Sequence, residues 1–252
     1  MRKMELKIQV SCVSNIGEIR SNNEDNIFFD GYILKMYNNG THNTLVKEIT
    51  TKEPKCFAVF DGMGGECKGE KASFYAAETF NKECKNILLE MPEIFLLNTC
   101  FKMNDRICQE QEIDKCYMGT TAAIIYFYLG KAYICNVGDS RIYQQKQGQL
   151  IQISKDHVIE IRNEKTKPAL TQNIGISEEE MKIEPYIVKC TCDSNDKFLI
   201  CSDGLTDMVS EEIISEILNQ DKSVKEITEE LLKIALDNGG KDNTTIIVCK
   251  II

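Results

Sequence analysis

The stretch VFDGMGGECKGEKAS, residues 59–73, holds four glycines within eight positions, directly after an aspartate. The apolar run that ends at Phe60 predicts a buried strand, and the sequence from Glu70 onward predicts a helix. A strand that ends in Asp61, followed by a loop with few side chains, indicates that something approaches the loop backbone closely. The first question is which ligand or segment that is.

Two phosphate-binding loops do not fit this stretch. A G-x-G-x-x-G loop would need a third glycine at position 67, where the chain has Cys67. Gly64 and Gly69 have the glycine spacing of a P-loop, but Glu70-Lys71 follows in place of Lys-Ser or Lys-Thr. A nucleotide-cradling loop is therefore a poor interpretation.

Composition narrows the class of protein. The chain has 252 residues, 42% of them hydrophobic, which suffices for a sizeable core. Thirty basic against 39 acidic residues give a net charge of −9, which argues against nucleic acid as a partner. No run of 18 apolar residues and no signal peptide is evident, so we expect no membrane association and a cytoplasmic location.

Twelve cysteines raise the question of disulfides or zinc. No C-x-x-C occurs, and neither histidine, His42 or His157, has the spacing of a zinc ligand. Several cysteines lie in apolar, strand-like runs, where a thiol behaves as a small hydrophobe. We therefore expect neither a disulfide framework nor a zinc site.

Short β-branched segments outnumber amphipathic helical ones. Strands are predicted near residues 5–13, 26–34, 56–60, 121–128, 131–137, 141–147, 183–190, 196–202 and 243–250. Helices are predicted at 70–90, 92–112, 211–219 and 223–237, and the polar stretch 35–55 is expected to be a surface loop or hairpin. Strands joined by short turns favour an antiparallel α+β layer architecture in one compact domain.

Acidic residues stand at the ends of several predicted strands. Asp61 and Asp203 each follow an apolar run and precede glycine, and Asp139 and Asp242 lie in similar turns. A further pair, Glu24-Asp25, leads into the strand that begins near residue 26. Each Asp-Gly alone is explained by turn geometry. The repetition of acidic residues at several strand ends favours a common functional role.

Carboxylates that meet at one place repel each other unless a cation neutralises them. Hard divalent cations such as Mn²⁺ or Mg²⁺ prefer oxygen ligands. Two such ions about 3.5–4 Å apart activate a bridging water as a hydroxide that can attack phosphorus. A glycine after the aspartate, as at Gly62, would let a backbone carbonyl serve as a further ligand.

Two arginines could each bind a phosphate through two parallel hydrogen bonds. Arg20 lies four residues before Glu24, and Arg141 follows Asp139-Ser140. For either one alone, a structural or surface ion pair is the simpler interpretation. His157 follows Asp156, and we expect that acid to orient it structurally.

At this point the residues resemble the metal-dependent protein phosphatase 2C (PPM) serine/threonine phosphatases in their compact bacterial form. Eight motifs match in the family's order across nearly the whole chain. They are Arg20-x-x-Asn23-Glu24-Asp25, Asp61-Gly62-Met63-Gly64-Gly65, Gly119-Thr120-Thr121-Ala122, Asn136-Val137-Gly138-Asp139-Ser140-Arg141, Asp156-His157, Leu170-Thr171-x-x-x-Gly175, Ser202-Asp203-Gly204-Leu205-x-Asp207 and Gly240-Lys241-Asp242-Asn243-x-Thr245.

The resemblance implies a four-layer βααβ sandwich over residues 1–252, with two antiparallel sheets flanked by helix pairs. The resemblance also implies roles for individual residues. Asp61 would bridge two Mn²⁺ or Mg²⁺ ions with the Gly62 carbonyl on one, Asp203 and Asp242 would hold the other, and Glu24 would act through water. Asp139 would contribute with Asp203 to a third ion, Arg20 would bind the substrate phosphate, and Asp25 would support the metal-water cluster.

The chain departs from the family pattern at four places. Met63 stands where some members carry a histidine proposed as general acid, and Glu66 stands where a histidine often follows the glycines. Gln172 replaces the arginine of the usual Leu-Thr-Arg. The segment 158–169 indicates a shortened flap beside the site.

The leading hypothesis is a signalling phosphatase that hydrolyses phosphoserine or phosphothreonine in proteins in one step. We expect a monomer that opposes a serine/threonine kinase. A pseudophosphatase that binds without turnover, and a hydrolase of another phosphoester such as a nucleotide, remain as alternatives.

Overall fold

Two antiparallel sheets packed face to face form the centre of the computed structural model, which describes residues 5–64, 68–159 and 168–252. The first sheet has the order β3 (Leu45–Thr50), β1 (Lys7–Asn15), β12 (Thr244–Ile251), β11 (Lys197–Cys201), β8 (Arg141–Lys146) and β9 (Gln149–Gln152). The second has the order β10 (Tyr186–Thr191), β7 (Lys131–Val137), β6 (Ala122–Tyr128), β4 (Lys55–Met63) and β2 (Asp25–Phe29), and β5 (Gly119–Thr120) pairs with the end of β4.

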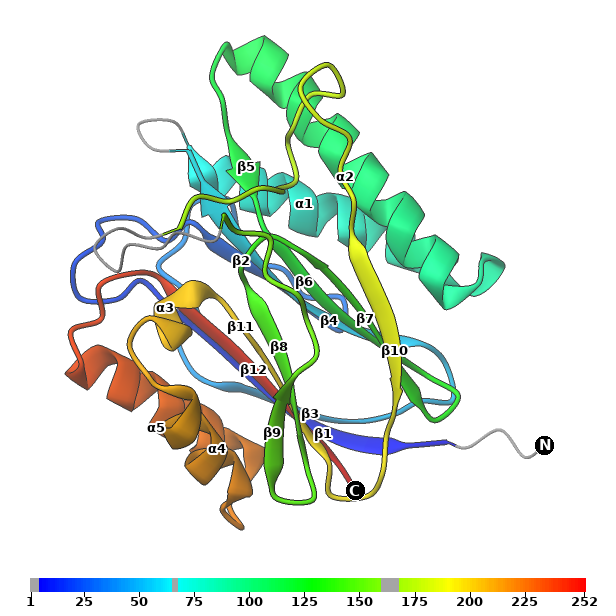
Figure 1. The fold of residues 1–252 in the computed structure, drawn as a ribbon, viewed down its shortest axis with the longest axis vertical. Coiled ribbons are helices and arrows are strands. Elements are labelled where there is room, and N and C mark those ends of the chain that lie inside the picture. Colours follow the sequence, from blue (N-terminus) through cyan, green and yellow to red (C-terminus); the bar gives the residue numbers. More distant parts are fainter. Residues whose placement is uncertain (1–4, 65–67, 160–167) are drawn as a thin grey trace.

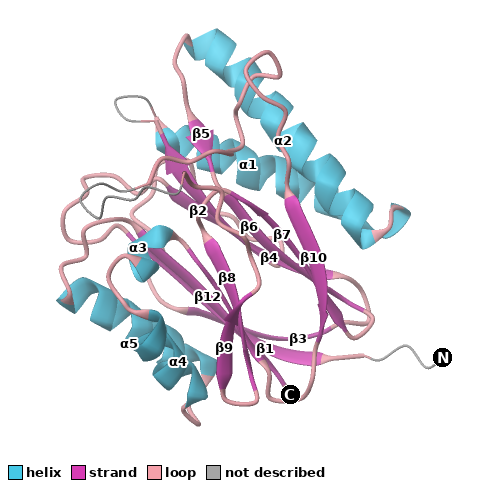
Figure 2. Ribbon diagram, in the orientation of Figure 1, coloured by secondary structure: helices cyan, strands magenta, loops and turns pink. Residues whose placement is uncertain are grey.

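Helices cover the outer face of each sheet (Figures 1 and 2). The second sheet carries α1 (Gly69–Glu83), the 3₁₀ turn η1 (Cys84–Leu89) and α2 (Pro92–Asp114). The first sheet carries α4 (Glu211–Asn219) and α5 (Val224–Asp237), and the one-turn helix α3 (Asp203–Thr206) follows β11. This arrangement confirms the predicted α+β four-layer sandwich.

Three apolar layers hold the elements together. One lies between the sheets and includes Phe57, Ile125 and Ile247. The other two lie under the helix pairs, with Phe80 beneath α1 and Leu231 beneath α5. Because both faces of the central strands are covered, they read as continuous apolar runs rather than as an alternating pattern.

Most predicted elements are confirmed, and the differences have local causes. The segment 35–55, expected to be a surface loop or hairpin, contains the edge strand β3, which pairs with β1 and whose partly exposed side chains give only a weak apolar pattern. The strand predicted over 26–34 stops at Phe29, because Asp30 and Gly31 turn with positive φ. The helix predicted over 70–90 tightens into the 3₁₀ turn at Cys84. Strands β5 and β9 and helix α3 were not predicted.

The helix starts near the C-terminus are as expected. The Ser210 hydroxyl caps α4 by accepting a bond from the Ile213 N–H. Ser223 and Glu226 form a reciprocal capping box at the start of α5. These bonds satisfy helix N–H groups that have no partner within the helix.

The cysteine expectation is wrong at one residue. Ten cysteines in the described part are free thiols, among them the buried Cys56, Cys135, Cys201 and Cys249. Cys116, just after α2, is disulfide-bonded. The spacing of cysteines alone does not give their connectivity, so it could not single out Cys116.

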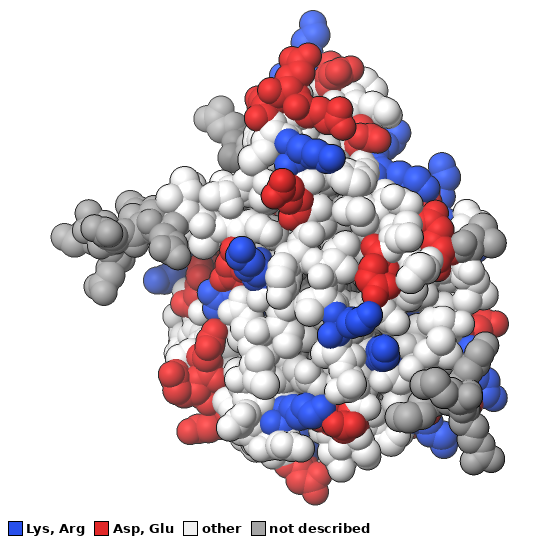
Figure 3. Space-filling view, turned by 45° about the vertical axis from the view of Figure 1, so that its right-hand side comes forward, with Lys and Arg blue, Asp and Glu red and all other residues white. Residues whose placement is uncertain are grey.

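The surface is mixed in charge. Figure 3 shows acidic and basic side chains interspersed over one face of the molecule. Among the described residues, no helix is both long enough and apolar enough to span a bilayer.

Candidate active site

A cleft of about 360 Å³ brings together residues from segments far apart in the sequence. Its lining includes seven of the eight predicted site residues: Arg20, Glu24, Asp61, Gly62, Asp139, Asp203 and Asp242. The eighth, Asp25, is buried at the start of β2, where it pairs in register with Asp61 of β4. Apart from Asp25, the acids at the strand ends therefore line one cleft.

Asp61 is fixed through its backbone by the strand that follows α2. Its N–H donates to the Thr121 Oγ1 at 3.0 Å, and its carbonyl accepts from the Thr121 N–H at 2.8 Å. The Thr120 hydroxyl donates to the same carbonyl at 2.9 Å. These bonds hold the end of β4 in place, so that the Asp61 carboxylate stands at the cleft.

Gly62 lies where three backbone segments meet. A Cβ at this position would overlap the Gly69 carbonyl at the start of α1 and would lie 2.6 Å from the Glu24 carbonyl oxygen. The Gly62 N–H donates to that Glu24 carbonyl at 3.1 Å. The sequence predicted that something lies close to the backbone of this loop. The protein's own backbone, at Gly69 and Glu24, accounts for at least part of that close approach.

Asp203 and Asp25 are joined by Ser202. Asp203 is the first residue of α3 and is buried, while the Ser202 hydroxyl donates to the Asp25 Oδ2 at 2.8 Å. The second oxygen of Asp25, Oδ1, is buried and has no hydrogen-bond partner among the described residues. Burial raises the pKa of Asp25 to about 7. The ionised carboxylate is therefore short of positive charge.

Glu24 shows the same shortage of positive charge. Burial raises the pKa of Glu24, and the neighbouring Glu70 raises it further. Arg20 opposes this effect, and its Nη2 forms an ion pair with the Asp242 Oδ2 at 2.6 Å. Repulsion among the carboxylates exceeds what this one arginine offsets at Glu24.

Arg141 and His157 do not line the cleft, and the structure gives both other roles. Arg141 donates to the Asp156 Oδ2 from Nε and contacts it from Nη2, both at 2.8 Å, and it also reaches Glu211. His157 accepts a hydrogen bond from the Gly138 N–H at its Nδ1. The expected orientation of His157 by Asp156 is therefore wrong, because Asp156 is held by Arg141 and Gln152.

The departures from the family pattern fall in three places. Met63 and Gly64 line the cleft. Gln172 faces away from the cleft lining: its amide oxygen accepts from the Glu184 N–H, and its amide nitrogen contacts the Met181 sulfur. Gly65, Glu66, Cys67 and residues 160–167 of the flap lie outside the described residues.

Residues that place the acids escaped the sequence analysis as functional candidates. Thr120 and Thr121 hold Asp61, Ser202 holds Asp25, and Asn243 accepts a hydrogen bond from the Glu24 N–H at 2.7 Å. All four stand inside the motifs quoted above. Membership of a motif was the available signal, and Ser202 and Asn243 also adjoin an acid, but neither feature reveals which distant segment a side chain reaches.

A metal site is not preformed in the part of the chain that the structure describes. No three His, Cys, Asp or Glu side chains there stand in an arrangement that could hold an ion as they are. Five carboxylates nevertheless line one cleft.

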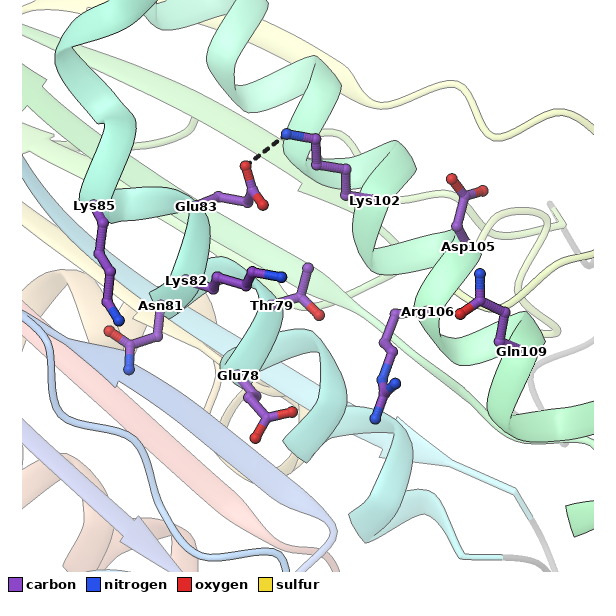
Figure 4. A pocket seen from close by; sticks show the side chains of 10 residues that line it. All are labelled: Glu78, Thr79, Asn81, Lys82, Glu83, Lys85, Lys102, Asp105, Arg106 and Gln109. Atoms are coloured by element: carbon purple, nitrogen blue, oxygen red, sulfur yellow. Dashed lines mark hydrogen bonds and ion pairs between the residues drawn. The ribbon is translucent and has the colours of Figure 1, made fainter. Parts of the chain in front are cut away.

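A larger pocket, of about 660 Å³, lies between α1, η1 and α2 (Figure 4). It is lined by charged side chains of both signs, and Lys102 crosses it to pair with Glu83 at 2.6 Å. Its charges largely offset one another, whereas five carboxylates face one arginine in the cleft at the strand ends. Size therefore does not identify the active site here.

Comparison with known proteins identifies the family. The family model described as protein phosphatase 2C matches residues 45–243. The serine/threonine phosphatase stp of Listeria innocua is 30% identical over 251 residues, covering 92% of this chain and 91% of the relative. The serine/threonine protein phosphatase PstP of Mycobacterium tuberculosis is 27% identical over the whole chain, which spans 46% of that relative's length.

Comparison with solved structures shows that the fold is also shared. The catalytic domain of the serine/threonine protein phosphatase PstP, determined in complex with two manganese ions, superimposes with a TM-score of 0.76 at 26% identity. The match covers 99% of this chain and all of that one. Together with the ordered motifs and the shared cleft, these likenesses show that the chain belongs to the protein phosphatase 2C family.

Proposed function

We propose that this protein is a metal-dependent phosphatase of phosphoserine and phosphothreonine in proteins. The observation that carries the proposal is the single cleft in which Glu24, Asp61, Asp139, Asp203 and Asp242 meet Arg20. The relatives' names support protein substrates. The net charge of −9 and the lack of a nucleotide-binding loop make a nucleotide substrate less suitable.

The residues of the cleft fit divalent cations. Every candidate ligand is an oxygen donor, which suits Mn²⁺ and Mg²⁺. The buried oxygen of Asp25 without a hydrogen-bond partner among the described residues supports a cation here, and burial raises the pKa values of both Asp25 and Glu24. The structure of PstP with two manganese ions supports the same chemistry by relationship.

We assign the ligands by position in the motifs. Asp61 would be shared by two ions, with the Gly62 carbonyl on one of them. Asp203 and Asp242 would hold the other, Glu24 would act through water and Asp25 would support the cluster. Asp139, with Asp203, would serve a third ion. When bound, such ions would lower the pKa of a water and polarise the phosphate.

The chain's own residues then bind and orient the substrate. The Arg20 guanidinium has five N–H donors, and the ion pair with Asp242 engages one terminal nitrogen, Nη2. The remaining donors could bind two phosphate oxygens in parallel. Met63 lines the cleft but its thioether has no proton to give, so the leaving alkoxide would take its proton from water or another group.

We further propose that residues 1–252 act as one catalytic domain, as a monomer in the cytoplasm, opposing a serine/threonine kinase. The test is a titration of the purified protein with Mn²⁺ and with Mg²⁺, using a phosphothreonine peptide, an aryl phosphate and a nucleotide. Release of phosphate from the peptide only with metal would support the proposal. Peptide affinity without release would favour a pseudophosphatase, and preference for the nucleotide would favour another phosphoester hydrolase.

A further inference from the structure

The segment that carries Arg20 and Glu24 has no regular secondary structure. It runs from the end of β1 at Asn15 to the start of β2 at Asp25. Arg20 is about half exposed, so its position is not set by burial. Contacts with another part of the chain must therefore hold this loop.

One partner is the turn before β12, which carries Asp242, and Asn22 also donates to Glu70 at 3.0 Å. The Glu18 N–H donates to the Gly240 carbonyl at 2.8 Å. Gly17 has a φ of +81°, and a Cβ there would lie 2.5 Å from the Asp242 carbonyl oxygen and 2.7 Å from the Gly240 carbonyl oxygen. The loop and the turn thus pack backbone against backbone, with no room for a side chain at residue 17.

One buried side chain, Asn243, bonds the loop at three points. Its Oδ1 accepts from the Glu24 N–H at 2.7 Å. Its Nδ2 donates to the carbonyls of Ile16 at 2.8 Å and Asn22 at 2.9 Å. The amide orientation is determined by these partners, since a flipped amide would face its donors toward an N–H and its acceptor toward two carbonyls.

The backbone of Asn243 also fixes the neighbouring acid. Its N–H donates to the Asp242 Oδ1 at 2.8 Å, while the Asp242 Oδ2 pairs with Arg20. A single residue, only 4% exposed, therefore contacts both ends of the loop and the carboxylate to which Arg20 is bonded.

We propose that Asn243 is a positioning residue, which sets the places of Arg20 and Glu24 relative to Asp242. Asn243 does not line the cleft, so it acts through the loop and not on the substrate. The structural part of this inference stands alone, whereas its kinetic part rests on the proposed phosphatase function. Two readouts keep these parts apart.

The first readout is hydrogen exchange of the Glu24 amide in the metal-free protein. In Asn243→Ala this amide loses its acceptor, and we expect it to exchange at least about tenfold faster than in the wild type. Asn243→Asp keeps an acceptor but loses both donors, so the Glu24 amide should stay protected. Unchanged protection in Asn243→Ala would overturn the proposal, whether or not the protein is a phosphatase.

The second readout is a double-mutant cycle at saturating Mn²⁺. We expect Asn243→Ala to raise KM for an aryl phosphate about tenfold in the wild type, but less than about twofold in Arg20→Ala. An equal factor in both backgrounds would show that Asn243 does not act through Arg20, and would overturn the kinetic part. Should Asn243→Ala fail to fold, the cycle is run with Asn243→Asp.

Asn238→Ala is the matched control. Asn238 ends α5 five residues earlier, and its amide donates to the Met208 carbonyl at 2.8 Å without touching the loop. We expect normal exchange at Glu24 and a normal KM for this variant. A change there equal to that of Asn243→Ala would indicate general loosening of the turn and would count against the proposal.

Discussion

Arg20 and Arg141 form ion pairs with carboxylates, but the two regions use these pairs differently. Arg20 contacts Asp242 through one terminal nitrogen and stands about half exposed at the cleft. Arg141 contacts Asp156, Glu211 and the Tyr143 hydroxyl from the start of β8. The first guanidinium keeps donors for a ligand, whereas the donors of the second are largely engaged within the protein.

The comparison shows what decides between function and structure for an arginine beside an acid. Both residues follow or precede motif acids in the sequence, so both were candidates for phosphate binding. The number of donors already engaged, and the presence of a cleft, separate them. Mutations in the two regions should therefore affect different measurements, hydrolysis for the cleft and stability for the Arg141 cluster.

The largest effect is expected from the carboxylates that face Arg20. Removing an outer partner of a metal ligand typically costs about 10–100-fold in affinity or activity. Loss of a ligand itself in Asp203→Ala or Asp242→Ala should therefore lower Mn²⁺-dependent kcat/KM by more than about 100-fold. Asp203→Ala should unfold near the wild-type temperature in the absence of metal, because removing one of several repelling carboxylates relieves like-charge repulsion. Asp242→Ala should unfold at a lower temperature, because it also loses the ion pair with Arg20 and the bond from the Asn243 N–H.

The assay is phosphate release from an aryl phosphate across a Mn²⁺ titration, with calorimetric unfolding in parallel. Asp156→Ala is the matched control, since this carboxylate belongs to the Arg141 cluster and not to the cleft. Full activity in both cleft variants would contradict the metal assignment.

The second prediction concerns Arg20 itself. Arg20→Ala should raise KM for an aryl phosphate and the inhibition constant of inorganic phosphate about tenfold or more, since a charge-assisted contact contributes about 1.5–3 kcal/mol. Arg20→Lys should recover only part of the loss, because a lysine cannot form the parallel pair of bonds. Phosphate inhibition that is unchanged in Arg20→Ala would place the substrate phosphate elsewhere.

Much of the fold and of the site could be predicted from sequence, and the failures share a cause. Apolar runs such as that before Asp61 identified the central strands, because burial on both faces leaves an unbroken signal. The edge strand β3 and the short β5 escaped, since their stability comes from pairing with distant strands. The same holds in the site: the motifs identified the acids, but not that Asn243 reaches residues 219 to 227 positions away.

The pairing of Asp156 shows the same limit. Sequence adjacency suggested that it orients His157, whereas Arg141, fifteen residues earlier, holds it. Contacts between side chains on adjacent strands and loops depend on register, which short motifs do not encode.

The smallest effect on catalysis is expected from Arg141. Arg141→Ala removes the partner of Asp156 and a contact of Glu211, both outside the cleft. Because the cluster is partly exposed, we expect a loss of about 2 kcal/mol in the free energy of unfolding rather than the larger cost of a fully buried pair. KM for the aryl phosphate should change by less than about twofold. Urea unfolding together with steady-state kinetics measures both quantities. If Arg141→Ala raised KM as much as Arg20→Ala and left stability unchanged, the assignment of Arg20 to substrate binding and of Arg141 to stability would be wrong.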